Sequence, residues 1–146
     1  MHIRMDHANE IRSLIVRQKL VGDAQDEAAT RACWARDATL NVVVNGGETR
    51  RAEGQEAVMA FTKNAWATDS HGSRNAPHVH FGGPAAITFL SDDRALVHST
   101  CLYVGPGEDA MIVHGYGRYE DETVLEEGVW KLLHRTLRIT QPNRKL

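Results

Sequence analysis

Residues 114–138 read HGYGRYEDETVLEEGVWKLLHRTLR, and this stretch decides the fold class. Both halves are dense in β-branched and aromatic residues, and Glu126-Glu127-Gly128 at the centre supplies a glycine where a hairpin turn needs a positive φ. The stretch is therefore predicted to form two long antiparallel strands. A hairpin of this length needs flanking strands and a covering layer of helix.

The second half of the chain predicts four strands joined by short polar or glycine-rich turns. The strands are expected at His78–Phe89, Ala95–Val104, Met111–Leu125 and Val129–Thr140. Consecutive strands joined by such turns form an antiparallel meander.

The first half carries the helical patterns. A helix is predicted from Asp6 to Val21, ended by Gly22, and a second helix is capped by Asp23 or Asp26 and extends through Cys33 and Trp34. A small hairpin (Ala38–Val44 with Glu48–Ala52) and a third helix that opens at Gly54-Gln55-Glu56 follow. Helices first and strands later favour an α+β fold over alternating βαβ units.

Composition sets limits on the class of protein. The 146 residues are 42% hydrophobic and 25% charged, which is ordinary for one globular domain spanning 1–146. A net charge of -2 with mixed signs argues against nucleic acid or a membrane surface as a partner. No apolar segment is long enough to span a membrane, and the N-terminus lacks a signal-peptide core, so a cytoplasmic protein is expected. Cys33 and Cys101 lie among apolar neighbours and are expected to be buried thiols.

Several local motifs follow one another along the chain. They are Asp23-Ala24-Gln25-Asp26, Trp34, Asp37-Ala38, Gly54-Gln55-Glu56-Ala57-Val58, His80-Phe81-Gly82-Gly83, Gly117-Arg118-Tyr119-Glu120-Asp121, Gly128-Val129-Trp130-Lys131 and Arg135. In this order and spacing the chain resembles the SnoaL-like branch of the NTF2-like superfamily, which includes scytalone dehydratase, bile-acid dehydratase, hexachlorocyclohexane dehydrochlorinase, polyketide cyclases and dioxygenase small subunits. The resemblance covers nearly the whole chain. It implies an NTF2-like (cystatin-like) cone, with three N-terminal helices packed on a strongly curved, mainly antiparallel sheet.

The resemblance also implies a catalytic pair, Asp23 at the end of the first helix and His80 at the start of the first long strand. Histidine exchanges a proton near neutral pH, and a carboxylate on its other ring nitrogen fixes the tautomer. The implied activity is that of a lyase or isomerase of the dehydratase or cyclase type, without cofactor or metal, acting on a small hydrophobic cyclic metabolite. Residues predicted to bind this substrate are Tyr103, Tyr116, Trp34, Phe61 and Trp66.

Other interpretations of the same residues stay open. Asp23 is also a good cap for the second helix, and His80 is also compatible with a structural role in a strand. His78 and His80, with His98 or His114, would allow a zinc site. The dehydratases carry a tyrosine near the helix-end aspartate, where this chain has Leu20-Val21-Gly22, so another donor such as Tyr103 or Tyr116 is needed.

Two other functions remain as alternatives. One is a non-catalytic binding or assembly module like the dioxygenase small subunits, and the other is a small-molecule carrier. Val79 and Phe81 are expected on the outer face of the sheet, where a monomer would expose them to water. A homo-oligomer, either a dimer or a trimer, is therefore expected.

Overall fold

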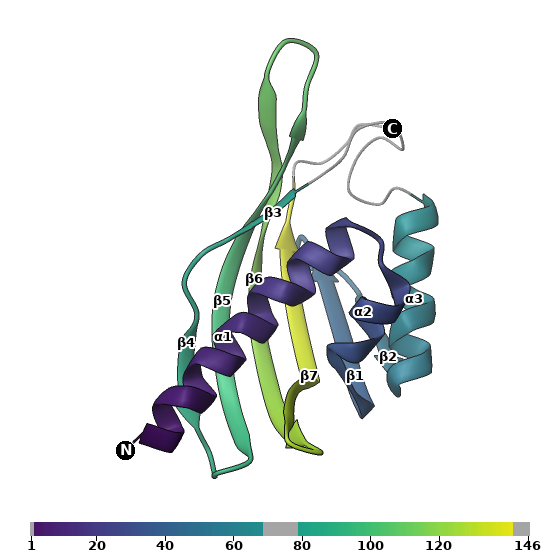
Figure 1. The fold of residues 1–146 in the computed structure, drawn as a ribbon. Helices are drawn as coiled ribbons and strands as arrows, with labels where there is room; N and C mark the ends of the chain where they lie inside the picture. Colours follow the sequence, from purple (N-terminus) through teal and green to yellow (C-terminus); the bar gives the residue numbers. More distant parts are fainter. Residues whose placement is uncertain (1, 69–78, 142–146) are drawn as a thin grey trace.

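A computed structural model describes residues 2–68 and 79–141 of the chain. The helices and strands are, in chain order, α1 (His2–Asp23), α2 (Glu27–Ala32), β1 (Trp34–Val44), β2 (Thr49–Glu53), α3 (Gln55–Thr68), β3 (Val79–Gly82), β4 (Ala86–Phe89), β5 (Arg94–Pro106), β6 (Met111–Glu126) and β7 (Val129–Thr140). The helices lie on one face of a strongly twisted sheet, and α1 crosses that face obliquely (Figure 1). The predicted α+β class is confirmed.

The strands form one sheet in the order β2-β1-β7-β6-β5-β3, with β4 also paired to β5. The predicted meander is confirmed for β5, β6 and β7, which pair antiparallel in sequence order. β1 joins β7 in parallel, while β2 returns antiparallel to β1. The parallel pair joins segments almost a hundred residues apart, so no local sequence pattern announces it.

The turn between β6 and β7 has the predicted chemistry. Glu127 and Gly128 both have positive φ, 53° and 77°, which is the conformation of the two-residue turns that match strand twist. β7 has the predicted bounds, and β6 ends one residue beyond them. The local turn signal therefore fixed the register of the central hairpin.

The predicted strand His78–Phe89 was wrong in one respect, because it is broken into β3 and β4. His78 lies outside the described residues. Pro84 has no N–H for a strand ladder, so pairing stops at the Gly83-Pro84-Ala85 segment. At Gly83 a Cβ would lie only 2.9 Å from Thr100 Oγ1, so the chain approaches β5 closely there before pairing with it again.

The second helix is shorter than predicted and the first is longer. α2 ends at Ala32, Cys33 caps it, and Trp34 starts β1 opposite Leu132 of β7. Pairing with β7 therefore overrides the helical pattern that had included Trp34. Gly22 stays helical, and α1 continues to Asp23.

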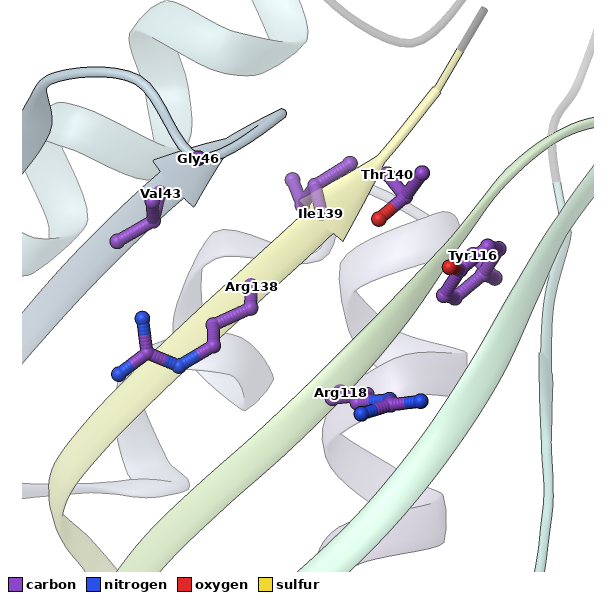
Figure 2. Close-up of a pocket in the computed structure, with 7 residues that line it drawn as sticks. All are labelled: Val43, Gly46, Tyr116, Arg118, Arg138, Ile139 and Thr140. Carbon is purple, nitrogen blue, oxygen red and sulfur yellow. The ribbon is translucent and has the colours of Figure 1, made fainter.

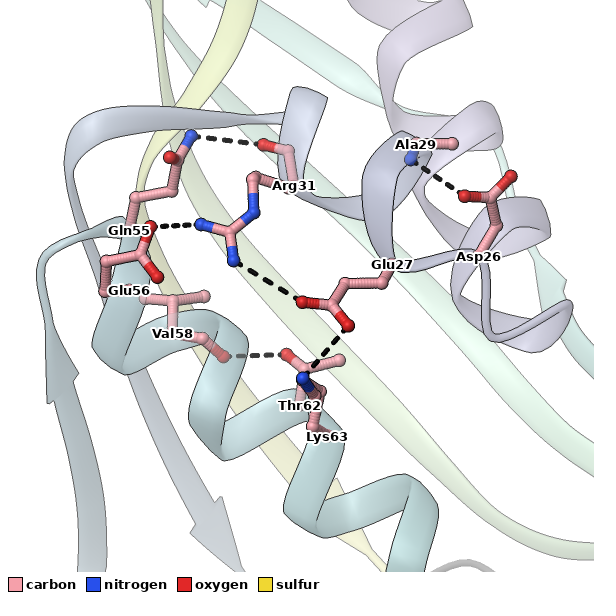
Figure 3. Close-up of polar contacts among 9 residues, drawn as sticks. All are labelled: Asp26, Glu27, Ala29, Arg31, Gln55, Glu56, Val58, Thr62 and Lys63. Carbon is pink, nitrogen blue, oxygen red and sulfur yellow. Dashed lines mark hydrogen bonds and ion pairs between the residues drawn. The ribbon is translucent and has the colours of Figure 1, made fainter.

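Asp26 caps α2, with its Oδ1 accepting the N–H of Ala29 at 2.9 Å (Figure 3). We predict that Asp26→Ala lowers the free energy of unfolding by about 1 kcal/mol, because an N–H at the helix start then loses its partner. Urea unfolding measures this change. Asp26→Asn is the matched control, since asparagine caps as well as aspartate. A loss as large in Asp26→Asn as in Asp26→Ala would contradict the capping role.

Polar contacts join α2 to α3 (Figure 3). Arg31 lies between Glu27, at 3.5 Å, and Glu56, and Lys63 contacts the other oxygen of Glu27 at 3.0 Å. Gln55 Nε2 donates to the carbonyl of Arg31 at 3.2 Å. These groups are partly or largely exposed to solvent, so the ion pairs contribute little stability.

The core lies between the helices and the concave face of the sheet. Ile11, Leu14 and Ile15 of α1 pack there, together with Val58 and Met59 of α3. Both cysteines are free and buried, as predicted. Within the described residues, no helix combines the length and the apolar character that crossing a membrane requires.

Candidate active site

Asp23 and His80 are in contact, at the junction of α1 and β3. Asp23 Oδ2 accepts the backbone N–H of His80 at 2.9 Å, and Oδ1 contacts Nδ1 of the same imidazole. Both side chains are largely buried, with exposed fractions of 16% and 21%. Because both carboxylate oxygens bind the same residue, the imidazole is fixed in position.

The position of Asp23 is electrostatically unusual. Asp23 is the last residue of α1, where the helix dipole disfavours a negative charge. Asp26 takes the capping task instead, so α2 does not need Asp23. A carboxylate placed at this helix end gains most from a cationic neighbour, and the imidazole of His80 becomes one when it takes a proton.

Lys19 lies one helical turn before Asp23 and is also buried, with an exposed fraction of 6%. Its Nζ lies 4.8 Å from the centroid of the Tyr119 ring and makes no ion pair with any residue of the described part of the chain. Burial lowers the pKa of Lys19, and the charge of Arg135 lowers it further. Gly82 leaves room for the lysine, since a Cβ there would lie 3.3 Å from its aliphatic chain.

Sequence analysis missed Lys19, although the chain carries a signal for it. Ile11, Ile15, Lys19 and Asp23 recur every four residues and so share one face of α1. Both isoleucines are core residues. A lysine that continues such a stripe is directed inward, and that placement alone marks it as a candidate site residue.

We predict that Lys19→Met raises the free energy of unfolding at neutral pH by about 1 kcal/mol or more, because a buried cation without a carboxylate partner carries a desolvation cost. The folded-state pKa of Lys19 lies below the usual value, so the unfolded state binds more protons between the two pKa values. The free energy of unfolding of the wild type therefore rises relative to that of Lys19→Met as the pH rises through this window, and the difference between the two proteins becomes smaller. Urea unfolding at neutral and alkaline pH measures the difference in free energy of unfolding between the two proteins. Both proteins contain the same tyrosines, so the effect of tyrosine titration on stability cancels in this difference.

Lys63→Met serves as the control for this prediction, since Lys63 is exposed on α3. We expect it to change stability by a few tenths of a kcal/mol at any pH. A Lys19→Met protein that is less stable than the wild type at neutral pH would contradict the assigned cost of the buried charge.

Arg135 and Asp121 form a buried ion pair beside Lys19. The Nε and Nη2 atoms of Arg135 donate to the two carboxylate oxygens of Asp121 at 2.7 and 2.8 Å, and Nη1 donates to Gln18 Oε1 at 2.7 Å. The guanidinium carbon lies 4.5 Å from the Tyr119 ring centroid and 5.5 Å from that of Trp34. This pair neutralises itself, which leaves Lys19 as the interior cation without a carboxylate of its own in the described residues.

Tyr103, which was predicted to bind substrate, lies against the imidazole of His80. The ring centroids of Tyr103 and His80 are 4.7 Å apart in an edge-to-face arrangement. The Tyr103 hydroxyl is 3.3 Å from that of Tyr119, which is 3.2 Å from Cys101 Sγ. Burial raises the pKa of both tyrosines, so they are neutral hydroxyl groups at physiological pH.

Tyr116, also predicted to bind substrate, lies on the opposite face of the sheet from His80, so the structure does not bring the two side chains together. His80 is opposite Tyr103 and Gly115 in the ladder, whereas Tyr116 pairs with Leu102 on the outer face. Side chains alternate between the two faces of a strand, and the difference of one residue decides the face.

The remaining predicted binding residues lie elsewhere in the interior. Trp34 is buried under Arg135, while Phe61 and Trp66 are half-buried on α3, which packs on β1, β2 and α2. The described residues contain no group of three potential metal ligands. His78, on which the zinc interpretation depends, lies outside them.

Residues 4–136 match the SnoaL-like domain family. The chain belongs to this family. No curated protein matches it in sequence. Similar solved structures are described as NTF2-like with a cystatin-like fold, which agrees with the predicted fold.

Three of the similar structures, all from Novosphingobium, carry the name of an enzyme or of an enzyme subunit. A protein of N. aromaticivorans described as a scytalone dehydratase has 21% identity and a TM-score of 0.76, with 96% of this chain and 88% of that chain covered. The hexachlorocyclohexane dehydrochlorinase LinA-type3 of N. barchaimii has 22% identity and a TM-score of 0.72, with 94% and 88% covered. A dioxygenase beta subunit of N. aromaticivorans, named for aromatic-ring hydroxylation, has 15% identity and a TM-score of 0.77, with 97% and 94% covered. At these identities the likeness establishes the fold alone.

Proposed function

We propose that this SnoaL-like protein is a cofactor-independent lyase or isomerase that acts on a small hydrophobic cyclic metabolite. His80 is the general base and acid, and Asp23 orients the imidazole and stabilises its protonated form. The observation that carries the proposal is the contact of both Asp23 oxygens with His80, one to the backbone N–H and one to the ring. A histidine held in this way has a fixed tautomer and a defined direction for proton transfer.

The chemical step requires only the groups of this chain and the substrate. Nε2 of His80 takes a proton from a carbon next to a carbonyl or two bonds from a leaving group. The electron pair of the broken C–H bond forms a C=C bond. The leaving group departs with its own bonding pair in an elimination, and the proton returns to a different atom in an isomerisation.

Lys19 is proposed to stabilise the negative charge that develops on the substrate oxygen or on the leaving group. Its ammonium lies within the buried region that contains Asp23, and no carboxylate of the described residues pairs with it. A preorganised cation in a water-poor site stabilises a developing anion more strongly than the same cation in water. Lys19 would therefore do the work of the tyrosine that the dehydratases carry where this chain has Leu20-Val21-Gly22. Tyr103, beside the imidazole, is a second candidate donor.

The proposed substrate is a compact apolar ring. Tyr103 supplies aromatic surface beside His80, whereas Trp34, Phe61 and Trp66 lie elsewhere in the interior. The dehydrochlorinase and the protein described as a scytalone dehydratase are similar in fold and are named for eliminations from cyclic compounds. Cyclic hydroxy-ketones and cyclic halides are thus the first compounds to examine.

Exchange of substrate C–H hydrogens for deuterium tests this function without knowledge of the natural substrate. The protein is incubated in D₂O with a panel of cyclic ketones, hydroxy-ketones and halides, and NMR follows loss of the C–H signal, release of the leaving group and appearance of alkene signals. We expect exchange or elimination for at least one compound class with the wild type and none with His80→Gln. Tight binding without exchange across the panel would favour a carrier. The absence of both binding and exchange would favour a non-catalytic assembly module like the dioxygenase small subunits.

A further inference from the structure

The β5–β6 hairpin extends beyond its neighbours in the sheet. Val79, the first described residue of β3, pairs with Val104, and the last residue of β7, Thr140, pairs with Tyr116. Past these points β5 and β6 pair only with each other among the described residues, and the hairpin projects from the body of the molecule (Figure 1). We call residues 105–113 the arm. A two-stranded ribbon is only marginally stable in water, so the arm needs a covering surface.

The arm carries apolar side chains along one strand and acidic residues at its tip. Met111, Ile112 and Val113 are consecutive and all exposed, Met111 by 63%. Glu108 and Asp109 form the tip of the turn and are also exposed, and neither makes an ion pair with a residue of the described part of the chain. A surface that covers the arm must therefore offer both apolar contact and positive charge.

The outer face of the sheet offers both. Tyr116, Arg118, Arg138 and Thr140 line an open hollow of about 260 Å³ together with Val43, Gly46 and Ile139 (Figure 2). Arg118 and Arg138 are directly opposite in the ladder, and like charges in that position repel each other. Arg138 is 3.7 Å from Glu120, while Arg118 has no ion pair within the described residues. This hollow is thus positively charged.

An apolar row borders the hollow. Phe81, Leu102 and Tyr116 are ladder partners on β3, β5 and β6, so their side chains share the outer face. Phe81 is 68% exposed and Tyr116 is 44% exposed. We call this row and the hollow together the socket. Aromatic residues and arginine are the residue types that interfaces favour over the rest of a protein surface.

The acidic tip of the arm cannot reach the arginine hollow of its own chain. Arg118 follows Met111 by seven residues on the same extended strand, and at about 3.4 Å per residue they lie roughly 24 Å apart. The acidic tip and the arginine hollow of one molecule therefore remain apart, although their charges and apolar character are complementary.

We propose that two copies of this chain associate reciprocally, with the arm of each copy lying on the socket of the other. Glu108 and Asp109 then pair with Arg118 and Arg138 of the second copy. Met111 and Val113, which share one face of β6, cover Phe81, Leu102 and Tyr116. A second copy fits better than a different protein, because each chain carries both halves of the contact and a two-fold axis satisfies both at once. The exposed apolar area of arm and socket is on the order of 600 Å² per chain, close to the roughly 800 Å² that each partner buries in a standard interface.

Charge reversal tests the contact. Glu108→Lys with Asp109→Lys gives an arm variant, and Arg118→Glu with Arg138→Glu gives a socket variant. We expect the wild type to sediment as a dimer. The dimer dissociation constant of each variant should be on the order of 10-fold higher or more, because two copies of the same variant now place like charges together. An equimolar mixture of the two variants is expected to dimerise as tightly as the wild type, because both contacts of the mixed pair again join opposite charges.

Arg36→Glu with Asp37→Lys is the matched control, since both residues are exposed at the other end of β1. This variant should dimerise like the wild type, and circular dichroism should give the same spectrum for every variant. A monomeric wild type, reversed variants that dimerise unchanged, or a variant mixture that stays dissociated would each overturn the proposal. None of the altered residues contacts Asp23, His80 or Lys19, so the outcome is independent of the proposed catalytic function.

Discussion

Replacing His80 by Ala is expected to lower turnover by a factor on the order of 100 or more, with the fold intact. Proton transfer by a positioned general base typically contributes 10²–10⁴-fold to a rate. The imidazole is the group that Asp23 holds from two sides, so its removal takes away the atom that exchanges the proton. Steady-state kinetics on the best compound of the exchange screen give kcat and KM, and kcat is expected to carry the loss.

Two further variants separate chemistry from structure. His98→Ala removes a histidine from the outer face of the sheet, where it pairs with Glu120 in the ladder, and should keep full activity. Asp23→Asn should lose less activity than His80→Ala if the carboxylate only orients the ring, because an amide oxygen can still accept the backbone N–H. Thermal unfolding checks that each variant is folded. Full activity in a folded His80→Ala protein would refute the mechanism.

Prediction from sequence succeeded where the signal is local. The turn at Glu126-Glu127-Gly128 and the adjacent strands depend on residues next to one another in the chain, and the structure confirms them. Trp34 was misplaced in a helix because its partner, Leu132, is almost a hundred residues away. Pro84 was a local signal that the prediction of one long strand did not use.

The same distinction applies to the site. Asp23 and His80 came from a resemblance that spans most of the chain, and the structure brings them into contact. Tyr116 is on the opposite face of the sheet from His80, and sequence alone does not reveal this because the face depends on the strand register. Lys19, Arg135 and Asp121 form the charged interior. The isoleucine stripe of α1 marks Lys19 from the sequence, whereas Arg135 and Asp121 are recognisable only once the burial of their strands is known.

Removing the carboxylate of Asp121 by Asp121→Ala is expected to lower the free energy of unfolding by about 3–5 kcal/mol. The side chains of Asp121 and Arg135 are 0% and 3% exposed, and two hydrogen bonds of 2.7 and 2.8 Å join them. The variant leaves the guanidinium buried with Gln18 as its remaining hydrogen-bond partner in the described residues, and an uncompensated buried charge is strongly destabilising. Urea unfolding measures the loss.

Glu120→Ala is the matched control, since Glu120 precedes Asp121 on β6 but lies on the outer face with a weaker ion pair at 3.7 Å. Its loss should stay below about 1 kcal/mol. The double variant Asp121→Leu with Arg135→Met should recover most of the stability, because it removes both charges and keeps apolar volume. A loss below about 1 kcal/mol in Asp121→Ala would contradict the assigned role of the pair.

If the double variant is stable, stability alone does not explain why the interior contains a buried arginine. The effect of Arg135 on Lys19 offers a reason. The pKa of Lys19 is lowered most by burial and next by the charge of Arg135, while Asp121 raises it more weakly. In the double variant the pKa of Lys19 should therefore rise. A folded, stable protein with reduced turnover and a displaced alkaline limb in its pH–rate profile would tie the ion pair to the chemistry of Lys19. Unchanged turnover and an unchanged profile would assign the pair to packing alone.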